Sequence, residues 1–462
     1  MPTRSTLSCP DTGVSLARFR ITLDCGLLAA LGLSGCGWTV TAPRPPLSAA
    51  RSGASVSSNW WRDIGGRTLD SYVREALGNS PTVEALAARV ELARADARLL
   101  TAASQPSISA QGARQFGRRQ AFETGGERAD AMRYAGGVSV GWEMDFWGRV
   151  RQLRQGARRQ VEASEADEEA GKLLLIAEIA RLDLARRRLT ADAAIVAETL
   201  AANDESVERL AEKYRAGITD ESVVDRQRAE GEALGREIEE IRRARRLAEL
   251  ALDRLLGREP GRTAWPEAPA MPDPPPPPTV VKTEVLARRP DIRASAERVA
   301  ATWHLSNAAT LDLLPKLQLS ALASGRTMRL TPSIDEWIAQ VAPTLEVPVW
   351  DPARLAQVKQ SKARAHLAAV EYRENVLRAF EETAAALANI TAQTTIERSA
   401  HLSAESLRKV HDRTLEKFRN GVSSQLDVLE DQRRSLEAQR AALLAREARL
   451  AAWIDLKSAI GG

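Results

Sequence analysis

Cysteine and histidine are scarce in this chain, and their scarcity excludes several classes of protein. The sequence has three cysteines and four histidines in 462 residues, and the cysteines Cys9, Cys25 and Cys36 all lie near its start. A disulfide framework is therefore excluded. The histidines show no metal-ligand spacing, and neither a Gly-rich phosphate loop nor a GxSxG motif is present. We therefore expect a protein that is not an enzyme and that binds no metal and no cofactor.

An excess of one charge sign is absent as well. The chain has 65 basic and 61 acidic residues and a net charge of +4. Proteins that bind nucleic acid usually present a uniformly basic face, so this mixture argues against a nucleic-acid partner. Aromatic residues make up only 4% of the sequence. Alanine, arginine, glutamate and leucine dominate instead, which is the composition of long helices.

Long hydrophobic runs are also missing beyond the N-terminal segment. No stretch reaches the roughly 18 consecutive apolar residues that a membrane-spanning helix needs. If the chain crosses a membrane, it must therefore do so with strands in a closed barrel, because only helices and closed barrels satisfy all backbone polar groups in lipid.

Proline is absent from two long windows, between Pro106 and Pro260 and after Pro352. Because proline breaks helix interiors, both windows can hold long helices. A helix of about 65 residues is near 100 Å long, which indicates a coiled coil, a repeat or a tunnel. We expect long helices and shorter return helices at Arg149–Arg215, Glu221–Leu256, Arg354–Arg419 and Gln425–Ile460.

The first 35 residues have the order of a secretory signal. Arg18 and Arg20 precede a mostly apolar stretch, Ile21 to Leu33, that ends in small residues. The segment closes with LSGC at 33–36, which resembles a bacterial lipobox. We therefore interpret residues 1–35 as the signal peptide of a lipoprotein and Cys36 as its lipidation site. An ordinary signal peptide with a chance cysteine is the alternative.

The sequence repeats itself. SPTVEA at 80–85 matches RPDIRA at 289–294, which lies 209 positions later, and KYRAGI at 213–218 recurs as KFRNGV at 417–422, 204 positions later. A repeat of this length indicates two copies of one unit that pack against each other. Nine prolines between Pro260 and Pro278 predict an extended joint between the copies. The predicted segments are 1–35 (signal peptide), 36–80 (N-terminal segment), 81–259 (repeat 1), 260–289 (Pro-rich linker) and 290–462 (repeat 2).

Alternating residues predict strands in each repeat. Five apolar side chains alternate with small or polar residues over about nine positions, the length and pattern of a membrane strand with one face toward lipid. These are Val138, Val140, Trp142, Met144 and Phe146. Its partner is expected from Ser107 to about Phe116, giving a hairpin at 107–146, and the second hairpin at 316–349 from strands Lys316–Gly325 and Trp337–Val349. A small soluble sheet packed on helices is the alternative.

Four strands cannot close a membrane barrel, because such barrels have at least about eight strands and an open edge leaves backbone groups unsatisfied in lipid. If these strands cross a membrane, several copies of the chain must share one barrel. An obligate oligomer follows from this interpretation.

Four segments carry a resemblance to a known family. They are Trp60-Trp61 with the LGNSP that follows at 77–81, WEMDFWGRVR at 142–151, RRPDIR at 288–293 and VPVWD at 347–351. In this order, and with the lipobox and the duplication, they resemble the TolC-type outer membrane efflux proteins, specifically the OprM/NodT lipoprotein branch.

The resemblance implies a mainly α fold with a membrane β-barrel. Three chains would form a homotrimer with one 12-stranded barrel in the outer membrane, and their long helices would form a hollow periplasmic cylinder. The Pro-rich linker and the N-terminal segment would lie in an equatorial belt. Such proteins are passive exit channels that export small toxic compounds. An inner-membrane pump of the RND class supplies the energy, a periplasmic membrane-fusion adaptor docks on the channel, and the helical hairpins open like an iris.

Two glycine turns are the main candidate sites. Gly217 and Gly421 each end a long helix, where glycine suits a left-handed backbone. The resemblance implies that these turns form the periplasmic mouth and dock the adaptor. The residues expected to do so are Tyr214, Arg215, Gly217, Ile218, Phe418, Arg419, Gly421 and Val422.

Asp427 and Glu430 are the candidate channel gate. At positions i and i+3 they share one helix face. The resemblance places them at the constriction, where copies of each acid would repel one another, attract cations and raise one another's pKa. Ser424 to Asp427 also has the pattern of a capping box, and both roles can hold. The first repeat has Val223 in place of Asp427.

Two other functions compete with an efflux channel. The same fold could serve type I protein secretion, although the lipobox favours efflux. A soluble periplasmic coiled-coil adaptor is the alternative from another class, but it would show one helical hairpin and a lipoyl-like domain.

Overall fold

A computed structural model describes residues 59–102, 104–119, 129–276, 287–327 and 336–462. Every described residue belongs to one compact unit. The signal peptide and the lipidation site Cys36 lie outside the described residues, so both stay predictions.

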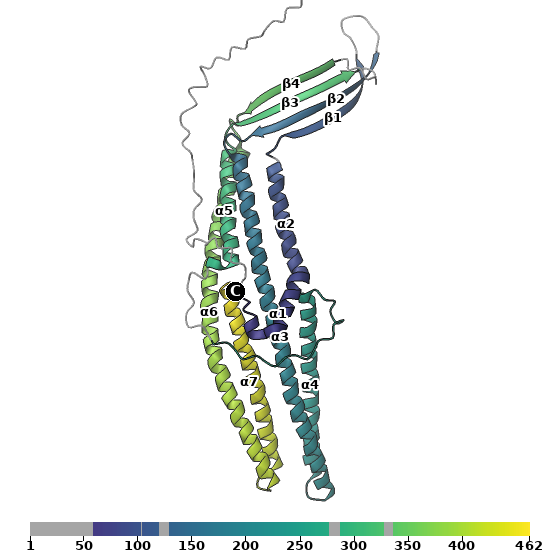
Figure 1. Ribbon diagram of the computed structural model, residues 1–462, viewed down its shortest axis with the longest axis vertical. Coiled ribbons are helices and arrows are strands. Elements are labelled where there is room, and N and C mark those ends of the chain that lie inside the picture. The colour runs from purple at the N-terminus through teal and green to yellow at the C-terminus, as the bar shows by residue number, and fades with distance from the viewer. Residues whose placement is uncertain (1–58, 103, 120–128, 277–286, 328–335) are drawn as a thin grey trace, which may run out of the picture. The chain divides into compact units, whose positions relative to one another are not determined.

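The described unit is mostly helical, with one sheet (Figure 1). The elements occur twice in the same order, after a first helix α1, as the duplication predicted. They are α1 (Arg62–Asn79), α2 (Pro81–Ala102), β1 (Ser107–Arg119), β2 (Ala129–Met144), α3 (Arg149–Arg215), α4 (Glu221–Leu256), α5 (Pro290–Leu311), β3 (Lys316–Thr327), β4 (Glu336–Glu346), α6 (Pro352–Arg419) and α7 (Gln425–Ala459). None of the helices in the described ranges is both long and apolar enough to cross a membrane.

The four strands form one antiparallel sheet in the order β1-β2-β3-β4. The two hairpins pair internally, and β2 pairs with β3 between them, so β1 and β4 are the edges. The predicted strand ends were wrong in three places. β1 extends to Arg119 and β2 begins at Ala129, while β2 ends at Met144, so Phe146 lies beyond the strand.

The end of β4 was also predicted too late, because the strand stops at Glu346 and not at Val349. Pairing explains the difference. Glu346 lies opposite Lys316, which is the first residue of β3, so the chain beyond Glu346 has no strand to pair with. Pro348 in that segment also lacks the N–H that a sheet ladder needs.

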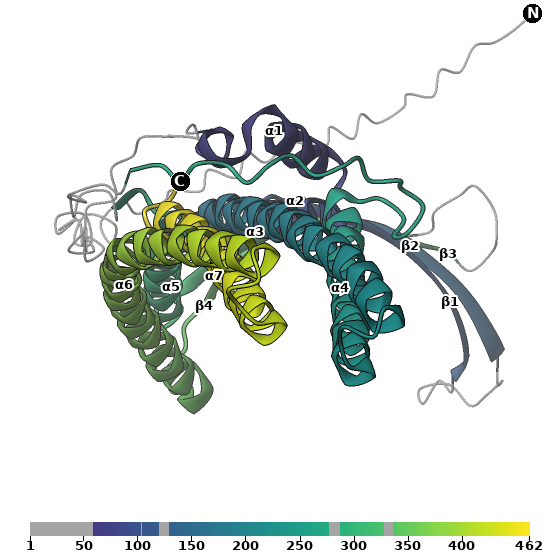
Figure 2. The same cartoon turned by 90° about the horizontal axis from the view of Figure 1, so that it is seen from below.

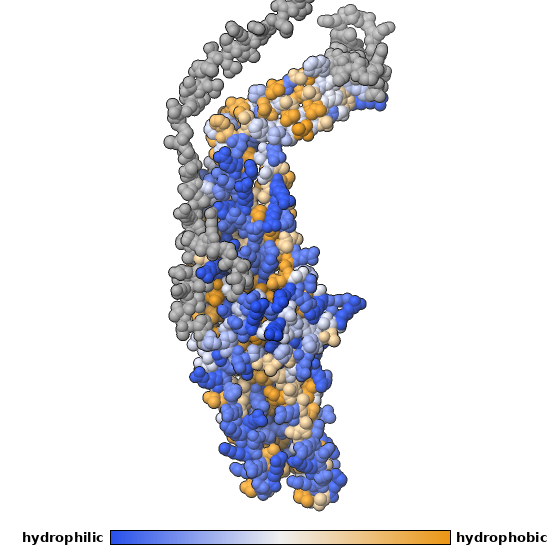
Figure 3. Space-filling view, viewed as in Figure 1, coloured by the Kyte–Doolittle hydropathy of each residue, from blue (hydrophilic) through white to orange (hydrophobic). Residues whose placement is uncertain are grey.

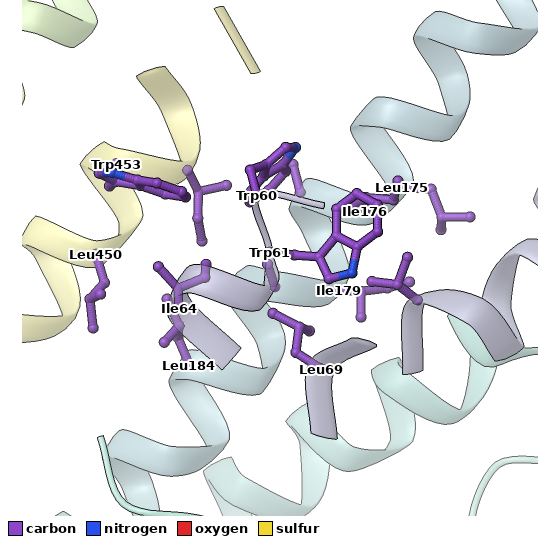
Figure 4. Close-up of a cluster of buried hydrophobic side chains, with 14 of the residues drawn as sticks. Trp60, Trp61, Ile64, Leu69, Leu175, Ile176, Ile179, Leu184, Leu450 and Trp453 are labelled. Atoms are coloured by element: carbon purple, nitrogen blue, oxygen red, sulfur yellow. The ribbon is translucent and has the colours of Figure 1, made fainter. Parts of the chain in front are cut away.

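The largest core joins both repeats near the middle of α3 and α6, where α4 and α7 end, and Figure 4 shows its side chains. Trp60 and Trp61, which precede α1, are buried there beside α3, α4, α6 and α7. The Trp60 ring lies 5.8 Å from the ring of Trp453 on α7. Trp61 Nε1 donates a hydrogen bond to Asp70, which also receives two from Arg62. The double tryptophan of the sequence is therefore a core element.

The Pro-rich segment after α4 is held by arginine side chains from both repeats. On α3, Arg186 Nη1 donates to the carbonyl oxygen of Pro266 at 2.8 Å. On α7, Arg446 Nε donates to Pro272 O at 3.0 Å. The guanidinium groups of Arg186 and Arg258 each lie 5.1 Å from the centre of the Trp265 ring. Seen from below, the segment runs along the helices on the side of α1 (Figure 2).

Candidate functional site

The turns α3–α4 and α6–α7 have the same geometry. Gly217 has φ +67° and Gly421 has φ +75°, both left-handed. The N–H of Ile218 donates to Lys213 O at 2.8 Å, and the N–H of Val422 donates to Lys417 O at 2.9 Å. These six-residue bonds, together with the bonds of the glycine N–H groups, are Schellman motifs, which need glycine at the left-handed position. The two turns lie at the same end of the unit (Figure 1).

The predicted docking residues differ in accessibility. Ile218 and Val422 are 73% and 77% exposed, and Tyr214 is 42% exposed. Arg215 and Arg419 are exposed too, but Phe418 is half-buried. Its ring lies 4.9 Å from Lys213 Nζ, so it joins the two turns and does not stand free on the surface.

Asp427 caps the N-terminus of α7. Its side chain accepts hydrogen bonds from the N–H of Ser424 at 2.9 Å and from the Ser423 hydroxyl at 3.0 Å, while its own N–H donates to Ser424 Oγ. This completes the capping box that the sequence indicated. The hydrogen bonds from Ser424, backbone first, and from Ser423 hold the pKa of Asp427 below its usual value. In the single chain the cap lowers the pKa of Asp427, whereas the same acid in neighbouring copies would raise it.

Glu430 lies one turn further along α7 and forms an ion pair with Arg434 at 2.5 Å. In the first repeat Asp220 is the N-cap of α4 and accepts from the N–H of Ser222 at 2.8 Å, which lowers the pKa of Asp220. Val223, the counterpart of Asp427, carries no acid. The two turns are therefore alike in backbone and different in where their carboxylates lie.

Polar contacts that the sequence did not predict join the two hairpins. Arg440 on α7 donates to Asp192 on α3 at 2.7 and 3.2 Å and also pairs with Glu237 on α4. Asp192 is buried. These partners lie 248 and 203 positions from Arg440, so only the fold could identify them among the many arginines and acids.

A second contact lies nearer the turns. Gln227 and Asn203 are buried and bond to each other, with Gln227 Nε2 to Asn203 Oδ1 at 2.6 Å. Gln425 at the start of α7 donates to Gln227 Oε1 at 3.2 Å. The sequence does not distinguish these buried amides from the exposed polar side chains of the same helices.

One face of the sheet is apolar across all four strands. The pairing places Ile108, Val140, Ala321 and Val341 in one row, and Val138, Trp142 and Met144 share that face of β2. Ile108 and Val341 are 74% and 69% exposed. Figure 3 shows apolar side chains on the strands, whereas hydrophilic ones prevail on the helices. The opposite face carries polar residues, as in the bond between the Ser109 and Ser139 hydroxyls at 2.8 Å.

The WEMDFWGR segment is a junction between a strand and a helix. Glu143 binds Arg149 through two bonds of 2.7 and 2.8 Å, and Asp145 accepts from the N–H groups of Val150 and Arg151 at the start of α3. The second repeat has the same arrangement. Glu346 binds Arg354 at 2.6 Å, and Asp351 caps α6.

No group of three or more His, Cys, Asp or Glu side chains in the described residues could hold a metal ion.

The comparisons agree with this architecture. The family model "Outer membrane efflux protein" matches residues 72–258 and 281–462. The pyoverdine export outer membrane protein OpmQ of Pseudomonas aeruginosa is 30% identical over 438 residues, which are 90% of each chain. Outer membrane protein OprJ of the same species is 28% identical over 94% of this chain and 95% of its own. The solved structure of the outer-membrane channel OprN matches with a TM-score of 0.80 and 25% identity, over 91% of this chain and 97% of that one.

These matches span both repeats, the sheet and the hairpin turns, and the relatives are an export protein, a protein and a channel of the outer membrane. The chain therefore belongs to the outer membrane efflux proteins of the TolC type, and it is an outer-membrane efflux duct.

Proposed function

We propose that three copies of the chain form a passive exit channel of a tripartite, RND-type efflux system. The sheet of each copy would add four strands to a shared 12-stranded barrel, with its apolar face toward lipid. An inner-membrane pump would supply the energy, and a periplasmic adaptor would dock on the hairpin turns. The cargo would be small toxic compounds, for which the pump and not the duct selects.

Surfaces left uncovered by the single chain support the trimer. β1 and β4 each pair on one side only, and an open edge in lipid leaves backbone groups unsatisfied. Along α6, apolar side chains such as Leu367, Leu377 and Leu402 are 56%, 63% and 56% exposed. A neighbouring copy would cover both features.

The observation that carries the gate is that polar contacts join the two hairpins below the main core. At mid-height a large apolar core joins them, whereas toward the turns the joining contacts are the polar pairs Arg440–Asp192 and Gln425–Gln227, with a small apolar cluster around Leu436 between these pairs. Polar contacts can exchange for water at low net cost. Hairpin α6–α7 would therefore move outward from hairpin α3–α4, pivoting at the core, and this is the iris-like opening.

The exposed side chains of the turns support adaptor docking. Ile218 and Val422 are apolar side chains at the tips of two equivalent turns, and Arg215 and Arg419 flank them. Such pairs of apolar and basic residues would bind a helical hairpin tip of an adaptor. Phe418 would contribute indirectly, through its contact with Lys213.

The test is the conductance of the purified protein in planar bilayers. The double variant Asp427→Asn/Glu430→Gln removes both charges and keeps the shape of the cap, so we expect a several-fold rise in single-channel conductance and weaker cation selectivity. The control Asp412→Asn/Glu416→Gln removes two exposed acids from α6 and should leave conductance unchanged. Equal conductance of the two variants would count against the gate, and a protein that forms no channel at all would refute the duct.

A further inference from the structure

The two helices that begin directly after a strand start with cations and without acids. From Arg149 to Val161 α3 has five arginines, and from Pro352 to Val370 α6 has four lysines and arginines, with no Asp or Glu in either stretch. The other described helices all have an acid in their first turn. Asp145 and Asp351 cap the two helix starts, so carboxylates already lie beside the first turn of each helix. The cations further along each helix have no acid in the same stretch of sequence.

Five of these lysine and arginine side chains are available to bind an external anion. Within the described residues their side chains form no ion pair or hydrogen bond, and all five residues are exposed. They differ from Arg149 and Arg354, which are bound by the junction acids. We call the five the basic collar; they are Arg151, Arg158, Lys359, Lys362 and Arg364.

Exposed apolar residues lie immediately before both stretches. Val349 and Trp350 are 91% and 78% exposed before α6, and Phe146 is 75% exposed before α3. Apolar and aromatic side chains followed by lysine and arginine are the pattern of a membrane interface. Mixed charges with acids would be expected if this region only faced water.

The reach of the side chains fits a membrane surface at the helix starts. At 1.5 Å per residue the collar lies within about 18 Å of the first residues of α3 and α6. Side chains of a helix lean toward its N-terminus, here toward the sheet, and lysine and arginine extend their charged ends to the interface. The electrostatic attraction itself extends over roughly 8 Å at physiological ionic strength.

A groove beneath the sheet offers a defined position for one headgroup. It has a volume of about 480 Å³ and lies between α3, α5 and α6. Arg364 of the collar lines it together with Arg149 and Arg354, and Leu153 and Leu305 form an apolar wall. Guanidinium groups beside leucines match the chemistry of a phosphate with its first acyl carbons. Asp312, the one acid in the lining, lies 2.9 Å from Lys316, 3.5 Å from Arg149 and 3.6 Å from Arg354. Among the described residues Arg364 is therefore the lining guanidinium that has no ion pair, and it would hold the phosphate.

We propose that the basic collar binds the headgroups of anionic phospholipids in the membrane leaflet on the helical side of the sheet. The collar would set the depth of the duct in the membrane, because its cations stop at the headgroups while Val349 and Trp350 enter the apolar region. This inference rests on the proposed function, in which the sheet crosses the outer membrane.

The experiment is native mass spectrometry of the purified full-length protein, reconstituted in nanodiscs of equal phosphatidylglycerol and phosphatidylethanolamine. We expect the wild type to retain phosphatidylglycerol over phosphatidylethanolamine by at least about fivefold, the factor that one basic residue near an anionic surface contributes. The variant with glutamine at all five collar positions should lose this preference. A control variant substitutes five other exposed arginines far from the sheet and should keep it: Arg236→Gln, Arg243→Gln, Arg254→Gln, Arg398→Gln and Arg408→Gln.

Equal lipid retention by the wild type, the collar variant and the control would overturn the proposal. If the collar variant instead changes only the anion selectivity of the channel, the collar faces the water-filled lumen, and the proposal is again wrong. Conductance of the same samples separates this inference from the duct itself. A protein that prefers phosphatidylglycerol but forms no channel would support the collar and refute the proposed function.

Discussion

The two helical hairpins have the same turn geometry, but the rest of the chain buries far more of α3 than of α6. Of the 67 residues of α3, 19 are buried, whereas only 8 of the 68 residues of α6 are. α3 packs against α1, α2, α4, α5 and α7, while α6 packs mainly against α5 and α7. The long helix of the first copy thus lies at the centre of the described unit, and the long helix of the second copy is mostly exposed. The two copies therefore have the same turn geometry, whereas the burial of their long helices differs.

Removing the ion pairs by which Arg440 joins the two hairpins should have the largest effect on stability and on opening of the channel. Arg440→Gln removes the ion pairs to Asp192 and Glu237 and, among the described residues, leaves the buried Asp192 with the more distant Arg188. We expect a loss of about 2 kcal/mol in stability, the scale of hydrogen bonds to charged groups, and a higher open probability. Melting temperature in detergent and bilayer recordings measure the two effects.

The matched control is Arg449→Gln. Arg449 binds Glu397 at 2.6 Å, but that pair joins α6 to α7 within one hairpin. This variant should lose similar stability without a change in open probability. If Arg449→Gln opens the channel as much as Arg440→Gln, the contact between hairpins is not what closes it.

The shared turn geometry predicts equal costs at two positions. Gly217→Ala and Gly421→Ala place a Cβ on a left-handed backbone, where alanine costs roughly 1 kcal/mol. Because the two Schellman motifs match, both melting temperatures should fall by the same amount. Gly235 lies inside α4 with open space around it. Gly235→Ala should therefore add up to about 1 kcal/mol of stability and raise the melting temperature. Unequal losses at the two turns would show that their surroundings differ in the assembled protein.

Removing the charge of the capping residues Asp427 and Asp220 should change stability least, and the change should be visible only at acidic pH. The pKa of Asp427 and of Asp220 is lowered in the folded chain, so each carboxylate stabilises the fold above the unfolded pKa of about 3.9 and loses this as the pH falls through the folded value. Melting temperatures of Asp427→Asn and Asp220→Asn should therefore fall less than that of the wild type between about pH 5 and pH 2. Asp427 accepts more hydrogen bonds, so its variant should differ more. A variant that follows the wild-type curve would contradict the role of that cap.

Much of the fold was predictable, because its elements have strong periodic signals. Proline-free windows and the two KYRAGI-like segments predicted both hairpins, and alternation predicted β2. The ends of the strands were not predictable, since Lys316 and its pairing decide where β4 stops. Apolar alternation in the second repeat is weak in sequence but clear in the sheet, where Val341 lies in the row of Val140.

The site was only partly predictable from the sequence. Glycine at two equivalent turns identified the tips, and the capping box identified one role of Asp427. The sequence could not reveal that Phe418 lies beneath Lys213, or that Arg440 rather than one of its many neighbours binds Asp192. These contacts depend on how α7 lies against α3, and no local pattern encodes that arrangement.

Because α7 extends far beyond the main core, a small rotation at the core would move its far end by a large distance. Leu450 and Trp453 are fixed in that core, and the turn at Gly421 lies about 30 residues away, or roughly 45 Å along the helix. A rotation of about ten degrees at the core would displace the turn by roughly 8 Å, while the side chains at the fulcrum would shift by less than the width of a methyl group. A small repacking around Trp60 could therefore produce a large change in aperture, and substitutions in the tryptophan cluster would alter gating far from where they are made.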